Sequence, residues 1–333
     1  MMNLLRKIFE SLKWRLGLKD QELLLKRLEE KTDFLLKQIC SGVEFAPMRE
    51  NIISRTGNPV VFISDRNYFE PTLVAIHSLC RHAEETTQYR IFLIITDCTD
   101  EEIALAESLF PGIEIISRLA PSMNIPLRTT HVTSTALLKF ELAGILPDCD
   151  QVLYLDGDIV VKKDLSPLFR LNLKDDYVAA VPDFRAMYEM SSSVSANGHG
   201  FYFNSGVLLL NLKQFRMNGI QQKLIRARAE SKDFHFVDQD CLNNVLRGKI
   251  RLLPLEYNVM ADNLAICFIP LEILAEQTGR SFSEIQQAIH SPAICHYGSP
   301  KPWNSSRVFK YGAFLEEKEC LERHRKNKVL YRH

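Results

Sequence analysis

The sequence predicts a doubly wound α/β fold. From Pro59 onward, short hydrophobic runs typical of strands alternate with amphipathic runs typical of helices. The run Gln151–Leu155 is hydrophobic in the way expected of a strand buried on both faces of a sheet. Two carboxylates follow that run directly. Because open α/β sheets bind ligands beyond the carboxyl ends of their strands, we expect the functional site at that edge.

The first part of this domain contains two strand–helix units. Val60–Ser64 has the pattern of a buried strand, and Pro71–Arg81 follows as a helix because proline is favoured in a first helical turn. The next strand covers Arg90–Thr96. Acidic residues at Asp100–Glu102 then open the second helix, where the helix dipole favours negative charge.

The order continues with three more strands and one helix. Ile113–Ile116 is predicted as the third strand, and Thr133–Leu146 as a helix that Pro147 ends. Gln151–Leu155 is the fourth strand, which we expect near the centre of the sheet. A later strand is predicted at Tyr177–Val181.

Helical segments are expected on both sides of a domain that covers residues 58–310. Residues 1–57 are predicted to form an N-terminal helical extension with a linker over Ser41–Gly57. The first helix carries an apolar stripe beside basic residues, which suits either an anionic membrane surface or a second copy of the chain in a homo-oligomer. Residues 311–333 are predicted to be a basic helical tail, for which membrane contact and a solvated chain end are the two alternatives.

Composition limits the classes of function. Lys and Arg number 41 and Asp and Glu also number 41, which argues against a nucleic-acid-binding protein because such proteins neutralise phosphates with excess positive charge. The eight cysteines are scattered without a C-x-x-C pair, as expected of reduced thiols in a cytoplasmic protein. No apolar run is long enough to span a membrane, and no signal peptide is evident. We therefore expect a cytoplasmic location, with contact to the inner face of the membrane left open.

The acidic pair at the end of the fourth strand is the first candidate site. Asp156 and Asp158 are one residue apart, so the turn after the strand brings their oxygens together. Two close carboxylates repel each other unless a cation lies between them. Oxygen ligands suit Mg²⁺ or Mn²⁺, which also bind diphosphates, and Gly157 lets a phosphate approach the backbone.

The same letters fit a phosphatase. Haloacid-dehalogenase-like enzymes also place D-x-D-x-[TV] after an apolar strand, and there Asp156 would be the phosphoryl nucleophile. That motif normally follows the first strand of its domain, whereas about three strands precede it here. A non-catalytic glycan-binding or scaffold protein is the other alternative.

Five ordered segments carry a resemblance to a known family. They are Phe62–Tyr68, Pro147–Phe169, Phe203–Leu212, Asp238–Asn243 and His296–Trp303. At these segments, over roughly Pro59 to Trp303, the sequence resembles glycosyltransferase family 8. These are retaining enzymes that include lipopolysaccharide galactosyl- and glucosyltransferases and glycogenin.

The resemblance implies a fold, a reaction and its ligands. The fold would be a GT-A-type nucleotide-sugar-binding domain with a mixed sheet. The reaction would transfer glucose or galactose from UDP-glucose or UDP-galactose, with retention, to a glycan, glycolipid or protein-linked sugar. Mn²⁺ or Mg²⁺ would be bound by Asp156, Asp158 and His296. For His296, a buried core histidine is the plainer alternative.

The resemblance also implies roles for individual residues. Gln239 would lie at the anomeric carbon and stabilise positive charge during a front-face displacement, while Asp238 and Asn204 would bind sugar hydroxyls. Asp238 also suits the N-cap of a helix over Gln239–Leu246. The implied donor-binding residues are Ser64, Asp65, Asn67, Tyr68, Lys139, Asp156, Gly157, Asp158, Ser205, Gly206, Gly298 and Lys301.

Two residues depart from the family pattern. Lys139 lies where many members have arginine, so it offers a point charge in place of a two-pronged donor. Gly298 comes one position early in the closing motif, with Ser299 in the usual glycine position.

Overall fold

The computed structural model describes residues 49, 51–120, 134–184, 186, 202–230, 237–260, 280–306 and 308–330. The predicted N-terminal helices, and with them the predicted oligomer contact, lie outside the described residues.

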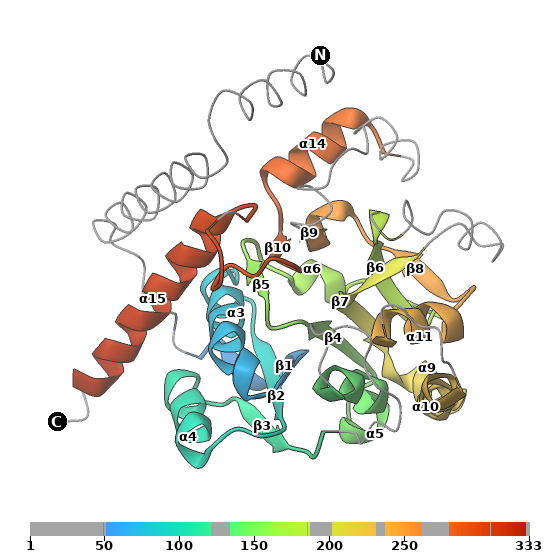
Figure 1. Ribbon diagram of the computed structural model, residues 1–333, viewed down its shortest axis with the longest axis horizontal. Coiled ribbons are helices and arrows are strands. Elements are labelled where there is room, and N and C mark those ends of the chain that lie inside the picture. The colour runs from blue at the N-terminus through green and yellow to red at the C-terminus, as the bar shows by residue number, and fades with distance from the viewer. Residues whose placement is uncertain are drawn as a thin grey trace, which may run out of the picture.

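A seven-stranded mixed sheet forms the centre of the molecule (Figure 1). Its order is β3-β2-β1-β4-β7-β6-β8. The strands are β1 (Ile53–Ser64), β2 (Tyr89–Ile95), β3 (Glu114–Ser117), β4 (Gln151–Leu155), β6 (Val178–Pro182), β7 (Phe203–Asn211) and β8 (Ile250–Leu252). β1 pairs in parallel with both β2 and β4, whereas β7 runs antiparallel to β4 and β6. The predicted fold class is therefore confirmed, with β4 in the middle of the sheet.

A second sheet of three short strands lies beyond the end of β4. It has the order β5-β10-β9, formed by β5 (Ile159–Val161), β9 (Val259–Met260) and β10 (Ile294–His296). β5 follows the acidic pair within the same stretch of chain, and β10 pairs with it in antiparallel register. This sheet brings the C-terminal part of the domain to the end of β4.

Helices cover both faces of the large sheet. On one side lie α3 (Phe69–Arg81), α4 (Asp100–Leu109) and α15 (Tyr311–Leu330), and on the other η2 (Ser134–Glu141), α5 (Leu142–Ile145), α9 (Leu212–Met217), α10 (Ile220–Glu230) and α11 (Val237–Val245) (Figure 1). The remaining short elements are η1 (Arg66–Tyr68), α6 (Ser166–Phe169), η3 (Leu255–Asn258) and α14 (Phe282–His290).

The alternation of side chains along each strand builds two separate cores. In β1, Phe62 packs into the core under α3, whereas its neighbour Val61 packs into the core under η2 and α9. In β4, Leu153 and Tyr154 divide in the same way. Burial on both faces explains why these strands read as continuous hydrophobic runs.

Two predicted elements differ in the structure. The linker predicted up to Gly57 is shorter, since β1 begins at Ile53 and a register irregularity lets both Ile53 and Asn58 face Tyr89. A Cβ on Gly57 would lie 2.6 Å from the backbone of Tyr89, so this close approach requires glycine. The single helix predicted over Thr133–Leu146 is instead the 3₁₀ segment η2 followed by the short α5, and η2 is buried on most of its sides.

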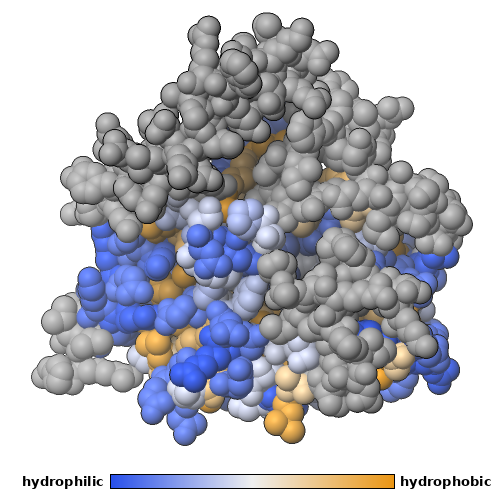
Figure 2. Space-filling view, viewed as in Figure 1, coloured by the Kyte–Doolittle hydropathy of each residue, from blue (hydrophilic) through white to orange (hydrophobic). Residues whose placement is uncertain are grey.

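The C-terminal helix α15 packs against α3, α4 and β5. Part of the basic tail is used in this docking, because Arg325 donates to Glu70 at 2.9 Å. The described surface in Figure 2 is mostly hydrophilic, and its hydrophobic residues form small separate groups. Among the described residues, none of the helices combines the length and hydropathy needed to cross a membrane.

Candidate active site

The acidic pair lies at the junction of the two sheets. Asp156 directly follows β4, and its backbone N–H donates to the carbonyl of Gly206 at 2.8 Å. Asp158 directly precedes β5, and its carbonyl accepts from the N–H of Tyr297 at 3.0 Å. The turn is therefore held from both sides, so that the two carboxylates have fixed directions.

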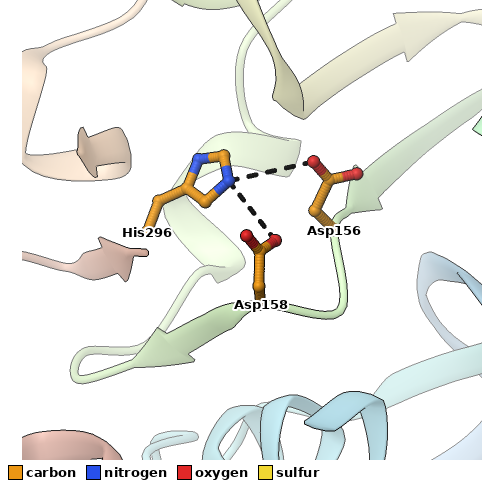
Figure 3. Close-up of side chains that lie close together, drawn as sticks. All are labelled: Asp156, Asp158 and His296. Carbon is orange, nitrogen blue, oxygen red and sulfur yellow. Dashed lines mark ion pairs between the residues drawn. The ribbon is translucent and has the colours of Figure 1, made fainter. Parts of the chain in front are cut away.

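His296 completes a cluster of three ligating side chains. It ends β10 and lies opposite Ile159 of β5. Its Nε2 is 3.4 Å from Asp158 Oδ1 and 3.8 Å from Asp156 Oδ2, and the three side chains point toward one another (Figure 3). One ligand atom from each residue lies within 4.8 Å of the others. Among the residues that the structure describes, this is the one group of three or more His, Cys, Asp and Glu side chains with that geometry.

Two glycines allow the site to close this tightly. A Cβ on Gly206 would lie 2.4 Å from His296 Cε1 and 2.6 Å from Asp156 Oδ2. A Cβ on Gly157 would lie 2.3 Å from the hydroxyl oxygen of Thr72. Both values are far below ordinary van der Waals separation, so alanine fits at neither position without movement.

Lys301 holds Asp158 from the other side. Its ammonium donates to Asp158 Oδ2, and it lies over the ring of Tyr68 at 5.5 Å. Burial would raise the pKa of Asp158, but Lys301 and His296 lower it well below its ordinary value. Burial would lower the pKa of His296, but the two carboxylates raise it above its ordinary value. Asp158 is therefore a charged group that is almost fully buried, with 5% of its side chain exposed.

A second buried ion pair adjoins the first. The Lys139 ammonium donates to Asp238 Oδ2 at 2.7 Å and lies 3.8 Å from Asp156 Oδ1. The Ser205 hydroxyl also donates to Asp238 Oδ2, at 2.8 Å. Burial would lower the pKa of Lys139, but Asp238 and Asp156 raise it. Helix α11 begins at Val237, so Asp238 lies in its first turn, and its carboxylate binds Lys139 and Ser205.

The predicted sugar-side residues are linked to one another. Asn204 Nδ2 donates to Gln239 Oε1 at 3.0 Å, and Gln239 Nε2 donates to Asp183 Oδ2 at 3.0 Å. The Ser205 backbone N–H donates to the same Gln239 oxygen at 3.0 Å. The start of α11 is thereby fixed to the start of β7.

The first predicted loop forms another wall of the site. Asp65 is buried and accepts from the backbone N–H of Tyr68 at 3.0 Å, which caps η1. The Ser64 side chain is buried, and Asn67 is exposed on η1. The Tyr68 ring packs edge-on against Trp303 with ring centroids 5.6 Å apart. The first and last predicted segments therefore meet at the acidic pair.

The closing segment keeps its glycine in an unusual conformation. Gly298 has φ +46°, in the left-handed region that favours glycine. The shift of this glycine by one position is thus accommodated within a turn that still delivers Lys301 to Asp158.

Three site residues escape the sequence analysis. The Tyr154 hydroxyl donates to Asp156 Oδ1 at 2.5 Å, and its position two residues before Asp156 on one strand could have shown it. Asp183 is the acceptor for Gln239. Asn258 contacts both Asn204 and His296, and no motif marks it because the contact depends on pairing between distant strands.

The donor set suits a hard divalent cation. Two carboxylates and one imidazole are ligands that Mn²⁺ accepts, and Mg²⁺ shares the preference for oxygen. The packed glycines and the carboxylates, which the turn holds close together, would give such an ion a defined position. The residues present therefore fit the predicted ion.

The sheet is mixed and doubly wound, and its central strand ends at this cluster of carboxylates and imidazole. This arrangement is typical of GT-A-type glycosyltransferases. The family described as glycosyl transferase family 8 matches residues 59–307 of the sequence. The chain belongs to that family, and the recognition from sequence is confirmed.

Named relatives agree with this assignment. Glycosyltransferase GlyE of Streptococcus pneumoniae serotype 4 is 31% identical over 270 residues, covering 76% of this chain and 58% of GlyE. A lipopolysaccharide 1,2-glucosyltransferase of Escherichia coli strain K12 is 34% identical over 192 residues, covering 55% of this chain and 53% of that protein. The chain thus spans a little over half the length of these curated relatives.

Solved structures show the same architecture. The galactosyltransferase LgtC, in complex with donor and acceptor sugar analogues, superposes with a TM-score of 0.68 at 28% identity, over 78% of this chain and 95% of LgtC. The crystal structure of GlyE from Streptococcus pneumoniae TIGR4 has a TM-score of 0.59 at 26% identity, over 83% of this chain and 64% of that chain. Neither the family nor these structures favour the phosphatase alternative.

Proposed function

We propose that the chain transfers glucose or galactose from a UDP-sugar to a glycan or glycolipid, with retention and with a divalent cation. The observation that carries this proposal is the convergence of Asp156, Asp158 and His296 beside Asn204 and Gln239. Names of relatives support the class of acceptor, since one is a lipopolysaccharide glucosyltransferase. A scaffold protein has no need of so many buried charges, which are costly unless they serve a ligand.

The cation and Lys301 act on the diphosphate. Mn²⁺ or Mg²⁺ held by Asp156, Asp158 and His296 would stabilise the negative charge of the leaving diphosphate. Lys301 is charged and already lies at Asp158, so it supplies a second positive charge at the same place. Gly157 and Gly206 let the side chains around the carboxylates pack closely on this side, while Ser64, Asp65, Asn67, Tyr68 and Gly298 would form the surrounding wall for the nucleotide.

The sugar lies on the side of Asn204, Asp238 and Gln239. Lys139 holds the Asp238 carboxylate in its charged form, so that it accepts from sugar hydroxyls. Gln239 is an amide and therefore a poor nucleophile, which favours front-face displacement over a covalent sugar–enzyme intermediate. Consistent with a glutamine in the active site, one solved structure of LgtC is an active-site variant with glutamine replaced by glutamate.

The first test is the release of UDP from UDP-glucose and UDP-galactose. We expect hydrolysis in Mn²⁺, none in EDTA, and recovery when Mn²⁺ is returned. Asp158→Ala should abolish the activity, and phosphomonoesters should not be cleaved. Metal-indifferent inertness toward every UDP-sugar offered would contradict the proposal.

The basic residues of α15 extend the proposal to the location of the enzyme. Lys326 is exposed near the end of α15, and anionic lipid attracts such residues by roughly 1 kcal/mol each. We place the enzyme in the cytoplasm at the inner face of the membrane. Sedimentation with anionic vesicles should fall with added salt, and indifference to lipid charge would contradict it.

A further inference from the structure

Four buried side chains form a hydrogen-bonded row from the sugar side of the site to the metal side. They are Gln239, Asn204, Asn258 and His296, and their exposed fractions are 5%, 7%, 1% and 4%. Each amide has one accepting oxygen and one donating nitrogen, so the direction of one member fixes the direction of the next. Neighbouring groups that can only donate or only accept a hydrogen bond show which atom of each amide is the oxygen and which is the nitrogen.

Gln239 is oriented by two groups that each have only one role. The carboxylate of Asp183 only accepts, so the Gln239 atom that faces it at 3.0 Å is the amide nitrogen. The backbone N–H of Ser205 only donates, so the Gln239 atom that faces it at 3.0 Å is the oxygen. That oxygen then accepts from Asn204 Nδ2 at 3.0 Å.

Asn204 is oriented independently by the backbone. The N–H of Gly206 lies 2.9 Å from the remaining Asn204 polar atom, which must therefore be the oxygen. The same oxygen faces Asn258 at 2.9 Å, so Asn258 contributes its amide nitrogen there. The contact with Gln239 and the contact with Gly206 independently give the same direction for Asn204.

Asn258 passes this direction on to the imidazole. With its nitrogen turned to Asn204, its oxygen faces His296 Nδ1 at 2.9 Å. In the neutral ring, which is the form that binds metal, the proton must then reside on Nδ1, which leaves the lone pair of Nε2 toward Asp156 and Asp158. Strand pairing makes the contact, since Asn258 directly precedes β9 and β9 runs beside β10 with Met260 opposite His296.

We propose that Asn258 is a positioning residue that selects the metal-binding tautomer of His296 and ties it to Asn204. This inference rests on the proposed metal-dependent function and deepens it. A histidine whose second nitrogen is held by a hydrogen-bond acceptor binds metal in one orientation, and loss of such a partner typically weakens metal binding or activity about 10- to 100-fold. The row also makes the metal side and the sugar side of the site one rigid unit.

Two substitutions separate this role from simple packing. Asn258→Asp retains an acceptor for His296 Nδ1–H but loses the donor to Asn204, whereas Asn258→Leu keeps the volume and loses both. Mn²⁺ is titrated into the full chain in the presence of UDP, and free Mn²⁺ is measured by electron paramagnetic resonance. We expect Asn258→Leu to bind Mn²⁺ about 10- to 100-fold more weakly and Asn258→Asp to bind it within about threefold of the unmutated chain.

Activity provides the second readout. In Asn258→Asp a carboxylate faces the Asn204 oxygen, so the kcat of UDP-sugar hydrolysis should fall about tenfold while Mn²⁺ binding is kept. If Asn258 only filled space, the opposite result would be expected. Asn258→Leu, which keeps the volume, would retain Mn²⁺ binding, and Asn258→Asp, which buries a charge, would lose it. Unchanged Mn²⁺ affinity in Asn258→Leu, or an equal loss in both variants, would overturn the proposal.

A measurement that needs no Asn258 variant covers the case in which those variants do not fold. With Zn²⁺ as a diamagnetic ion, nitrogen NMR of His296, assigned by difference from His296→Asn, should show the proton on Nδ1. A proton on Nε2 would overturn the tautomer assignment. Failure of the proposed function is recognised separately, because the unmutated chain would then neither bind Mn²⁺ with UDP nor release UDP from a UDP-sugar.

Discussion

Two clusters of buried charge lie on the same domain and are built in opposite ways. One is the proposed active site at the end of β4, and the other lies between α3 and α15. In the second, Arg81 donates from Nε and its terminal nitrogen to Glu317, and also to Glu316 at 2.6 Å. Lys162 adds a further donor to Glu316 at 3.2 Å. Glu316 and Glu317 face Arg81 and Lys162, so these four charges balance before His77 and His82, which lie beside Glu317, are counted.

The active site carries an excess of negative charge. Asp156, Asp158 and Asp238 face the two ammonium groups of Lys139 and Lys301, before His296 and Asp183 are counted. The carboxylate–imidazole separations of 3.4 and 3.8 Å are similar to those from His77 and His82 to Glu317, 3.5 and 3.6 Å, so the two clusters differ in charge balance and not in contact length. Charges that balance one another stabilise the fold, whereas an unbalanced group of buried charges is arranged for a ligand.

The largest expected effect is on activity, from Asp156→Asn. Loss of a metal ligand should lower kcat by about 1000-fold, or about 4 kcal/mol of transition-state stabilisation. The free energy of unfolding of the metal-free protein should stay the same or rise, since one negative charge is removed from a group that repels itself. Initial rates and urea unfolding measure the two quantities.

Asp150→Asn is the matched control, because Asp150 precedes the same strand but is 71% exposed. It should change neither quantity appreciably. If Asp156→Asn lost stability in step with activity, the contrast between the two clusters would fail.

Glu317→Gln tests the other cluster. The Glu317 side chain is fully buried, and removing one partner of such an ion pair should cost about 3 kcal/mol of the free energy of unfolding. Activity per folded molecule should be unchanged. Glu316→Gln is the control, since this side chain is 30% exposed and should cost less than about 1 kcal/mol. Equal costs at the two positions would show that burial does not set the energy.

Metal binding should stabilise the folded chain through the proposed active site and not through the α3–α15 cluster. Mn²⁺ at about 100 times its Kd should raise the free energy of unfolding by about 2.7 kcal/mol, since the ion binds only the folded chain. Thermal unfolding with and without Mn²⁺ should show the same increment in Glu317→Gln and none in Asp156→Asn. An increment in Asp156→Asn would place the ion elsewhere.

The smallest expected effect is a pH dependence from His324 of α15. Burial, with His77 and Lys328 nearby, lowers the pKa of His324 to about 4, against 6.5 in its ordinary state. Between these values the unfolded chain binds the extra proton, so the free energy of unfolding should fall as pH drops from 6.5 toward 4. We expect a loss of about 1 kcal/mol, reduced by the partial exposure of the side chain.

His324→Gln should reduce this slope and leave the part that comes from His82, whose pKa burial also lowers, whereas substitution of the exposed His290 should not reduce it. Protonation of Glu317 does not contribute to the pH dependence of the free energy of unfolding above pH 5. The Arg81 and His77 contacts outweigh burial and lower its pKa to about 2, so its contribution is lost only as pH falls from 4.5 through 2. A slope that is not reduced in His324→Gln would assign the effect to another group.

Elements that depend only on residues near one another in the chain can be predicted from the sequence. The hydrophobic periods of β2 and β4 and the acids opening α4 require only neighbours in the chain, and these elements are found where predicted. The strand predicted at Val60–Ser64 lies within β1, which begins earlier, at Ile53. The 3₁₀ form of η2 could not be predicted, because it follows from burial of residues such as Lys139 under distant strands. For the site, the acidic pair stands out in the sequence because both acids follow one strand.

Contacts between the two sheets are not marked by any pattern of neighbouring residues in the sequence. His296 was singled out through a motif, whereas Asn258 has none, although each contacts the other through the register of β9 and β10. Tyr154 is an intermediate case. No motif marks it, but the alternation of side chains along β4 places it on the same side as Asp156. The roles predicted for all of these residues remain predictions until the variants above are measured.

The junction of the two sheets also implies that the proposed cation would bind late in the folding of the chain. His296 comes 140 residues after Asp156 (296 minus 156), and it reaches the carboxylates only when β10 has paired with β5. Contacts that are so far apart in sequence form slowly, after local helices and strands. During refolding, binding of the proposed Mn²⁺ should therefore mark completion of the whole domain, and the circular dichroism signal of the helices should recover before it.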